Sequence, residues 1–197
     1  KTSLPYSGIC LTDTFQLAEK KHNELFTEFF QDNSKRVKKQ MATHVRVIVG
    51  NPPYSIGQKS AHDDAQNLQY PNLDKRIADT YVKFLAGIHS DYIQSEASLK
   101  KSLYDSYIKA FRWASDRISQ DEGGVVAFIS NGAWLDSSAG SGIRRCFEEE
   151  FTSIYVLNLR GNQRTSGELS RKEGGKIFGS GSRTPITITF LVKNPVK

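Results

Sequence analysis

Short runs of β-branched and apolar residues alternate along this chain with amphipathic stretches of helical spacing. The clearest apolar runs are residues 45–49, 125–130, 153–159 and 184–192. Between the first two, residues 103–118 place apolar side chains on one helical face. Strands that alternate with helices indicate an α/β fold with a largely parallel sheet. In such sheets, ligands bind at the carboxyl ends of the strands.

The remaining segments fit the same pattern less strongly. Residues 8–11 predict a short strand that ends at Thr12 and Asp13, and residues 15–40 predict a helix with a break at residues 32–34. Further helices are expected near residues 74–85 of the long polar stretch 55–101 and over residues 142–151. Asn131 and Asp136 lie in a predicted loop, where they either face the ligand cleft or cap the loop.

Composition limits the class of protein. The chain has 197 residues, 38% of them hydrophobic, which suits a single domain with its own core. Two cysteines, Cys10 and Cys146, form no disulfide framework and fit a reducing, cytoplasmic location. No apolar run approaches the roughly 18 residues that span a bilayer, so we expect no membrane partner.

The most informative local pattern is Asn51-Pro52-Pro53-Tyr54, which directly follows the apolar run 45–49. Two prolines fix the backbone and carry no amide hydrogens, so the Pro52 carbonyl and the Asn51 side chain offer two rigid acceptors. Tyr54 adds an aromatic face. This arrangement suits a planar group that bears an NH2, such as the exocyclic amine of a flipped adenine. The alternative is a proline-rich turn that merely closes a strand.

Basic residues and glycines are concentrated between residues 160 and 183. The net charge of the chain is +6, and the basic residues of this segment are Arg160, Arg164, Arg171, Lys172, Lys176 and Arg183. Such a segment can follow a phosphate backbone, because glycine allows close approach and arginine neutralises charge. An ordinary mobile surface loop explains the same composition.

On these residues the chain resembles the amino-group DNA methyltransferases. Asn51-Pro52-Pro53-Tyr54 looks like their catalytic (Asp/Asn/Ser)-Pro-Pro-(Tyr/Phe/Trp) motif, and the order of the other segments resembles the γ class of adenine methyltransferases. The amino-acid sequences of residues 50–58, 104–115 and 158–162 are similar to those of the single-polypeptide type I restriction–modification enzymes of bacteria (type ISP). The resemblance implies methyl transfer from S-adenosylmethionine to adenine N6 in double-stranded DNA.

The resemblance also implies roles for single residues. Asn51, Pro52, Pro53 and Tyr54 become catalytic residues, with Tyr54 and Phe178 stacking on the extruded base. Asp13 becomes a cofactor contact, and the basic residues of segment 160–183 become DNA contacts. The four histidines share no metal-binding pattern, so no metal is expected.

The chain departs from the family in one respect: it contains no Gly-rich loop of Phe-x-Gly-x-Gly type before residue 8. Residues 1–197 therefore read as the second half of a Rossmann-like methyltransferase domain, mostly parallel with an antiparallel last strand. The missing parts are the N-terminal half and the target-recognition domain, and we expect this fragment to be inactive alone. Two alternatives stay open: a nucleic-acid-binding module without catalysis, and a methyltransferase acting on RNA or protein glutamine.

Overall fold

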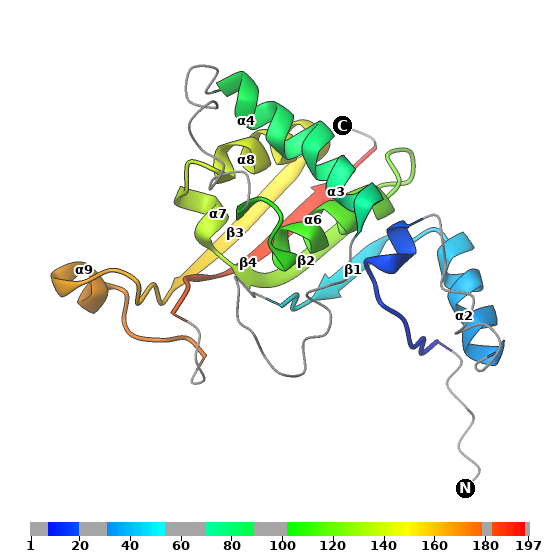
Figure 1. The fold of residues 1–197 in the computed structure, drawn as a ribbon, viewed down its shortest axis with the longest axis horizontal. Helices are drawn as coiled ribbons and strands as arrows, with labels where there is room; N and C mark the ends of the chain where they lie inside the picture. Colours follow the sequence, from blue (N-terminus) through cyan, green and yellow to red (C-terminus); the bar gives the residue numbers. More distant parts are fainter. Residues whose placement is uncertain (1–7, 20–30, 54–69, 89–101, 179–182, 196–197) are drawn as a thin grey trace, which may run out of the picture.

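A four-stranded mixed sheet forms the centre of the computed structural model, which describes residues 8–19, 31–53, 70–88, 102–178 and 183–195 (Figure 1). The strands are β1 (Val47–Gly50), β2 (Gly124–Asn131), β3 (Ser153–Arg160) and β4 (Ile186–Lys193), in the order β1-β2-β4-β3. β1 is parallel to β2, whereas β4 is antiparallel to both β2 and β3. The predicted α/β class and the antiparallel last strand are confirmed.

Helices cover one face of this sheet, as Figure 1 shows. They are α3 (Pro71–Ile77), α4 (Lys83–Ile88), α6 (Ser106–Arg117), α7 (Ala133–Asp136) and α8 (Gly140–Glu150). A π-helical segment, η3 (Ala78–Val82), joins α3 to α4 without a break. α8 crosses this helix closely at Gly142, where a Cβ atom would lie 2.1 Å from the Tyr81 carbonyl oxygen. Only glycine permits that approach.

Aromatic rings fill the core between helices and sheet. Phe111 of α6 lies 5.1 Å from the Phe128 ring of β2, 5.4 Å from Phe147 of α8 and 6.1 Å from Trp134 of α7, measured between ring centroids. All four side chains are buried. Because these rings come from four elements, the cluster fixes the helical layer on the sheet.

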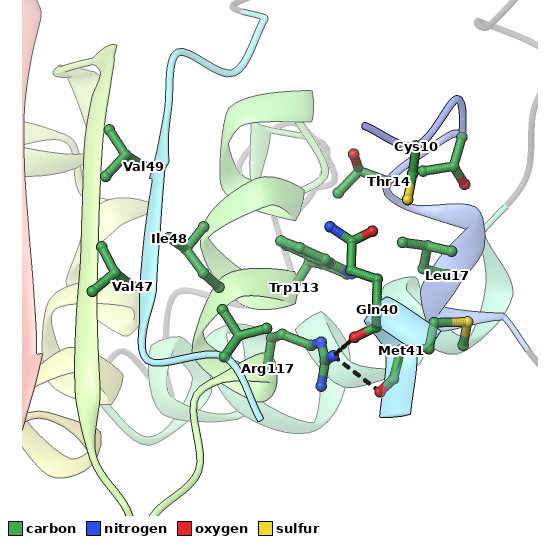
Figure 2. A pocket seen from close by; sticks show the side chains of 12 residues that line it. Cys10, Thr14, Leu17, Gln40, Met41, Val47, Ile48, Val49, Trp113 and Arg117 are labelled. Atoms are coloured by element: carbon green, nitrogen blue, oxygen red, sulfur yellow. Dashed lines mark hydrogen bonds between the residues drawn. The ribbon is translucent and has the colours of Figure 1, made fainter. Parts of the chain in front are cut away.

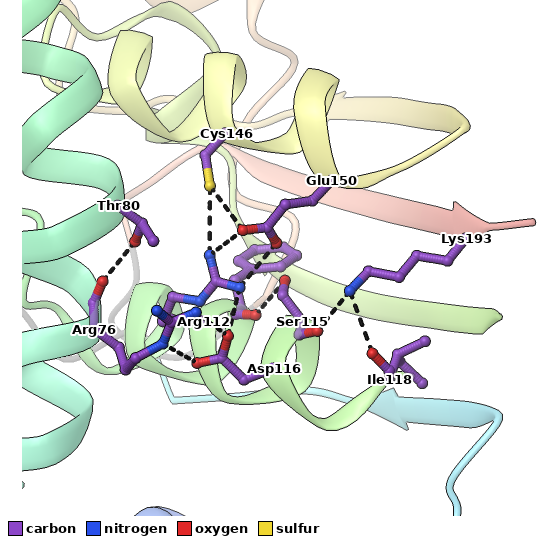
Figure 3. A network of polar contacts seen from close by, with 10 residues as sticks. Arg76, Thr80, Arg112, Ser115, Asp116, Ile118, Cys146, Glu150 and Lys193 are labelled. Atoms are coloured by element: carbon purple, nitrogen blue, oxygen red, sulfur yellow. Dashed lines mark hydrogen bonds and ion pairs between the residues drawn. The ribbon is translucent and has the colours of Figure 1, made fainter. Parts of the chain in front are cut away.

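A buried ion-pair network joins three helices beneath this core (Figure 3). Arg112 of α6 donates to both carboxylate oxygens of Glu150 of α8 and to Asp116, each at 2.8 Å. Asp116 also accepts two hydrogen bonds from Arg76 of α3. A fully buried guanidinium needs such partners, because a buried charge without them is costly.

The opposite face of the sheet carries exposed apolar side chains. Val47 and Val49 of β1, Tyr155 and Leu157 of β3, and Phe190 of β4 point to this face and remain largely accessible. Parallel strands are usually covered on both faces. The described sheet is therefore covered on one side and open on the other.

Several sequence predictions need correction. Residues 8–11 form no strand: Ile9 and Leu11 are 67% and 68% exposed, and the Leu11 backbone bonds to the Asn33 side chain instead. The expected break at residues 32–34 is also wrong, since α2 (Gln31–Ala42) runs through it. The Asn33 side chain makes its hydrogen bonds with the Leu11 backbone, so it does not compete for the backbone hydrogen bonds of α2.

Two predicted loops contain helices. α7 lies within the expected loop 131–136, and α9 (Gly167–Lys172) lies within the glycine-rich segment. The short 3₁₀ helix η1 (Gln16–Ala18) lies within the predicted helix 15–40, and α2 covers its second part and extends two residues further, to Ala42; the middle of the predicted helix is outside the described residues. The predicted helix 74–85 begins earlier, at Pro71, and extends to Ile88. The strands at 45–49, 125–130, 153–159 and 184–192 and the helices at 103–118 and 142–151 are confirmed, with small shifts of their ends.

Candidate functional site at the carboxyl edge of the sheet

The Asn51-Pro52-Pro53 turn begins where β1 ends. Gly50 closes the strand directly beside the Phe128 ring, where a Cβ atom would lie 3.2 Å from a ring carbon. A larger residue would require the Phe128 ring or the strand end to shift by a few tenths of an ångström. Asn51 and Pro53 are exposed, and Pro52 is half-buried. The turn therefore stands at the carboxyl edge of the parallel pair β1–β2, as predicted; Tyr54 lies outside the described residues.

The end of β2 supplies a capped loop. The Asn131 side-chain oxygen accepts a hydrogen bond from the Ala133 amide at 2.9 Å, so this residue caps the start of α7. Its amide nitrogen is fully buried and has no partner in the described chain. Asp136 is exposed within α7. Of the two roles that the sequence allows, the loop cap is the one seen for Asn131.

Asp105 is an acidic residue at this edge that the sequence pattern does not single out. It is the N-cap residue of α6, whose other end reaches Ile118, the bridge partner of Val45 before β1. α6 thus runs antiparallel to β1 and β2, which places Asp105 toward their carboxyl ends. Its two carboxylate oxygens are buried and make no hydrogen bond of regular geometry in the described chain. Burial raises the pKa of Asp105 to about 6, against the opposing effect of the nearby α6 amides and of Arg164.

Residues 160–178, here called the basic arm, follow β3 and extend from the carboxyl edge (Figure 1). The arm is internally hydrogen-bonded rather than loose. Gly161 donates to the Glu173 carbonyl, Asn162 donates to the Glu173 carboxylate at 3.0 Å, and Gln163 bonds to Ser170. The Gln163 amide also bonds to the Arg183 carbonyl at the base of the arm. The arm is thus a folded projection that carries most of the predicted basic residues.

Asp13 performs a different task in this structure. One carboxylate oxygen accepts a hydrogen bond from the Phe15 amide at 2.9 Å, and the other accepts one from the Tyr70 hydroxyl at 2.7 Å. Burial and the Asp13 carboxylate together raise the Tyr70 pKa. Nearby, Glu19 accepts hydrogen bonds from the Asn72 and Leu73 amides at the start of α3. Asp13 therefore tethers the N-terminal segment to α3.

A groove of about 480 Å³ separates that segment from β1 (Figure 2). One wall is β1 with Trp113 and Arg117 of α6, and the other consists of Cys10, Thr12, Thr14, Leu17, Gln40 and Met41. Arg117 is committed within the chain, because it donates to the carbonyls of Gln40, Met41 and Thr43. The groove thus presents mainly apolar and neutral side chains.

Neither a metal centre nor a membrane span is found among the described residues. No three His, Cys, Asp or Glu side chains of the described chain lie close enough to hold a metal ion. No helix in the described part is long and apolar enough to cross a membrane.

Fold and site together define an open α/β sheet protein with a polar turn and a basic arm at the ligand-binding edge. No family model and no curated protein matches the chain. Solved structures do match it. The chain is 45% identical to the Type ISP restriction–modification enzyme LlaGI, solved as a nuclease-deletion mutant with a DNA substrate mimic, at a TM-score of 0.83.

Two further structures match comparably. The Type ISP enzyme LlaBIII bound to DNA is 38% identical at a TM-score of 0.83, and DrdV in a DNA complex is 36% identical at 0.77. The three matches cover 98%, 100% and 95% of this chain, but only 15%, 12% and 17% of LlaGI, LlaBIII and DrdV respectively. The chain is therefore similar, over nearly all of its length, to one segment of much longer restriction–modification enzymes.

Proposed function

We propose that this chain is part of the catalytic domain of an adenine-N6 DNA methyltransferase within a restriction–modification enzyme. The observation that carries the proposal is the position of Asn51-Pro52-Pro53 directly after β1, at the carboxyl edge of the sheet. The similarity to Type ISP enzymes supports it, because this turn lies inside the matched segment.

The chemistry of the turn concerns the target amine. The lone pair of the adenine amino group is delocalised into the ring, which makes the nitrogen a poor nucleophile. In our proposal the Asn51 side-chain oxygen and the Pro52 carbonyl accept one amine hydrogen each, which localises the lone pair on nitrogen. Tyr54 and Phe178 hold the base by stacking, in place of the neighbouring bases that stack on it within the duplex.

Double-stranded DNA is the partner that the basic arm and its base fit best. The basic residues at the same carboxyl edge of the sheet, on and after β3, are Arg160, Arg164, Arg171, Lys172, Lys176 and Arg183, and Lys172 alone among them pairs with an acid, Glu168, in the described chain. Cations in such a position bind phosphates by counterion release. The DNA in the structures of LlaGI and LlaBIII supports this assignment.

The methyl donor that we propose is S-adenosylmethionine, and we expect its binding to need parts of the intact enzyme outside the described residues. Both oxygens of Asp13, the expected contact, already accept hydrogen bonds from Phe15 and Tyr70. The sequence has no Phe-x-Gly-x-Gly loop either. We therefore assign cofactor binding to the intact enzyme and expect these 197 residues to be inactive by themselves.

The second candidate is a DNA-binding module without catalysis of its own. Asp13 favours this candidate, because both of its carboxylate oxygens accept hydrogen bonds within the chain and a binding module needs no cofactor contact. The two candidates differ in what the intact protein does to DNA: only the first transfers a methyl group to adenine.

The experiment compares variants of the intact enzyme. Asn51→Ala should lower the rate of adenine methylation by at least about 10²-fold, while DNA affinity is unchanged. Asn51→Asp is the matched control, because it keeps an acceptor oxygen and should retain measurable activity. Full activity of Asn51→Ala contradicts the role of the turn, and DNA binding without any methylation by the unaltered enzyme favours the module.

A further inference from the structure

Large apolar side chains that remain exposed fall into three groups. One group lies on the open face of the sheet and one on the N-terminal segment. The third group lies on the basic arm and consists of Leu169, Ile177 and Phe178, which are 65%, 42% and 38% exposed. The first group belongs to the uncovered face of the sheet. The third group stands on a strongly basic projection, where exposed apolar side chains need a separate explanation.

Hydrogen bonds within the arm hold the segment that carries these side chains in a compact fold. The hydrogen bonds of Glu173 to Gly161 and Asn162, and those between Gln163 and Ser170, close it into a compact unit. Leu169 lies within α9, whose exposed residues also include Arg171 and Lys172. An exposed apolar side chain and two exposed cations thus share this short helix.

The charges around Leu169 favour a polyanionic partner. Both acids of the arm have partners within it: the exposed Glu168 pairs with Lys172 at 3.2 Å, and Glu173 accepts a hydrogen bond from the Asn162 amide. In the described part of the chain, Arg164, Arg171 and Lys176 have no ion pair. The arm therefore carries a net positive charge, with five basic residues against two acids, and Leu169 is exposed on it.

We propose that Leu169 is a wedge that enters the DNA duplex while the neighbouring basic residues hold the phosphates. Proteins that distort DNA insert apolar side chains between base steps and flank them with cations. This inference rests on the proposed function, because a wedge at the carboxyl edge that also carries the Asn51 turn would help to keep the target base out of the stack. Leu169 is a positioning residue in this role and does not touch the reacting atoms.

The test uses the intact enzyme and a cognate duplex with 2-aminopurine in place of the target adenine. Fluorescence reports base extrusion, and anisotropy gives the affinity over a range of salt concentrations. Leu169→Ala should weaken duplex binding by about tenfold and reduce the fluorescence rise, while the dependence of affinity on salt stays the same. Leu169→Met keeps the apolar bulk and should restore both signals.

Arg171→Ala is the matched charge variant. It should lower the slope of log K against log salt by about 0.9, because one phosphate is no longer neutralised. If Leu169→Ala binds and flips like the unaltered enzyme while Arg171→Ala weakens binding, the wedge is wrong and the proposed function stands. An equal loss of affinity by Leu169→Ala on single-stranded DNA or RNA also overturns the wedge. If the unaltered enzyme does not bind duplex DNA, the proposed function itself fails.

Discussion

Arg112 and Glu150 form a two-pronged ion pair, with both guanidinium-to-carboxylate distances at 2.8 Å, that joins α6 to α8 in the interior of the protein. Arg112 is 1% exposed, and the same guanidinium lies over the Tyr81 ring. The pair therefore connects the helix that precedes β2 with the helix that precedes β3. The alignment of those two helices sets the helical layer over the sheet.

The first prediction concerns this pair. Glu150→Ala leaves the Arg112 charge buried with only Asp116 as an acidic partner, and should lower the free energy of unfolding by about 3–5 kcal/mol. Urea unfolding of the 197-residue chain measures the change. Glu149→Ala is the matched control, because Glu149 is exposed and pairs only with exposed Arg145; its effect should stay below about 0.5 kcal/mol. Equal effects of the two substitutions would contradict a structural role for the buried pair.

The second prediction concerns the pH dependence of stability at Asp105. Burial raises its pKa to about 6 from an ordinary value of 3.8, so the folded state binds the proton more tightly than the unfolded state. Asp105 therefore lowers stability progressively as pH rises from about 4 to about 6, by up to about 3 kcal/mol. Asp105→Asn removes this dependence.

The measurement is the difference in unfolding free energy between the original chain and Asp105→Asn at several pH values. The variant should be the more stable protein at about pH 7, and its advantage should shrink toward about pH 4. A difference that stays constant over this range would show that Asp105 titrates alike in both states. If Asp105→Asn also lowers activity of the intact enzyme, the buried carboxylate serves the site rather than the fold.

The elements that the sequence predicts well carry their signal locally. β2 is one unbroken apolar run, and α6 repeats its apolar residues at helical spacing, so both follow from short-range patterns. Residues 8–11 are equally apolar, but a strand needs a neighbour, and here the Leu11 backbone bonds to Asn33 instead. Strand formation depends on pairing that no local pattern contains.

The residues of the candidate site also differ in how far a local sequence pattern predicts them. The turn at Asn51 follows from its own residues, because two prolines after an apolar run fix both the stop and the acceptors. The role of Asp13 does not, because its partner Tyr70 is 57 residues away. Asp105 suits its N-cap position locally, but its raised pKa comes from burial, which no local pattern gives.

The third prediction concerns the two cysteines. Cys146 is buried, its thiol contacts Glu150 and Arg112, and burial followed by the Glu150 charge raises its pKa to about 12. Cys10 is half-buried and lines the groove beside β1. In the native chain, a disulfide reagent should therefore modify Cys10 quickly and Cys146 at least about a hundredfold more slowly.

Thiol titration with and without denaturant gives both rates. Cys10→Ser should abolish the fast phase, and Cys146→Ser should leave it unchanged. A fast phase that survives in Cys10→Ser would mean that the core around α8 opens readily. Both thiols should react at similar rates in urea, because unfolding removes the difference in their surroundings.

The last prediction concerns the open face of the sheet. Val49, Phe190 and Tyr155 lie in one row across β1, β4 and β3, with Ala127 of β2 completing it, and the three larger side chains are exposed. An apolar row of this kind promotes association, so the 197-residue chain alone should bind a hydrophobic dye and form oligomers. Replacing Val49 and Tyr155 with lysine should reduce dye binding and shift sedimentation toward the monomer.

The free energy of unfolding should change by less than about 1 kcal/mol, because these side chains are exposed and bury little surface on folding. Val126→Lys places the same charge on the covered face and should instead unfold the chain. Unchanged dye binding and oligomerisation of the double variant would show that another surface drives association.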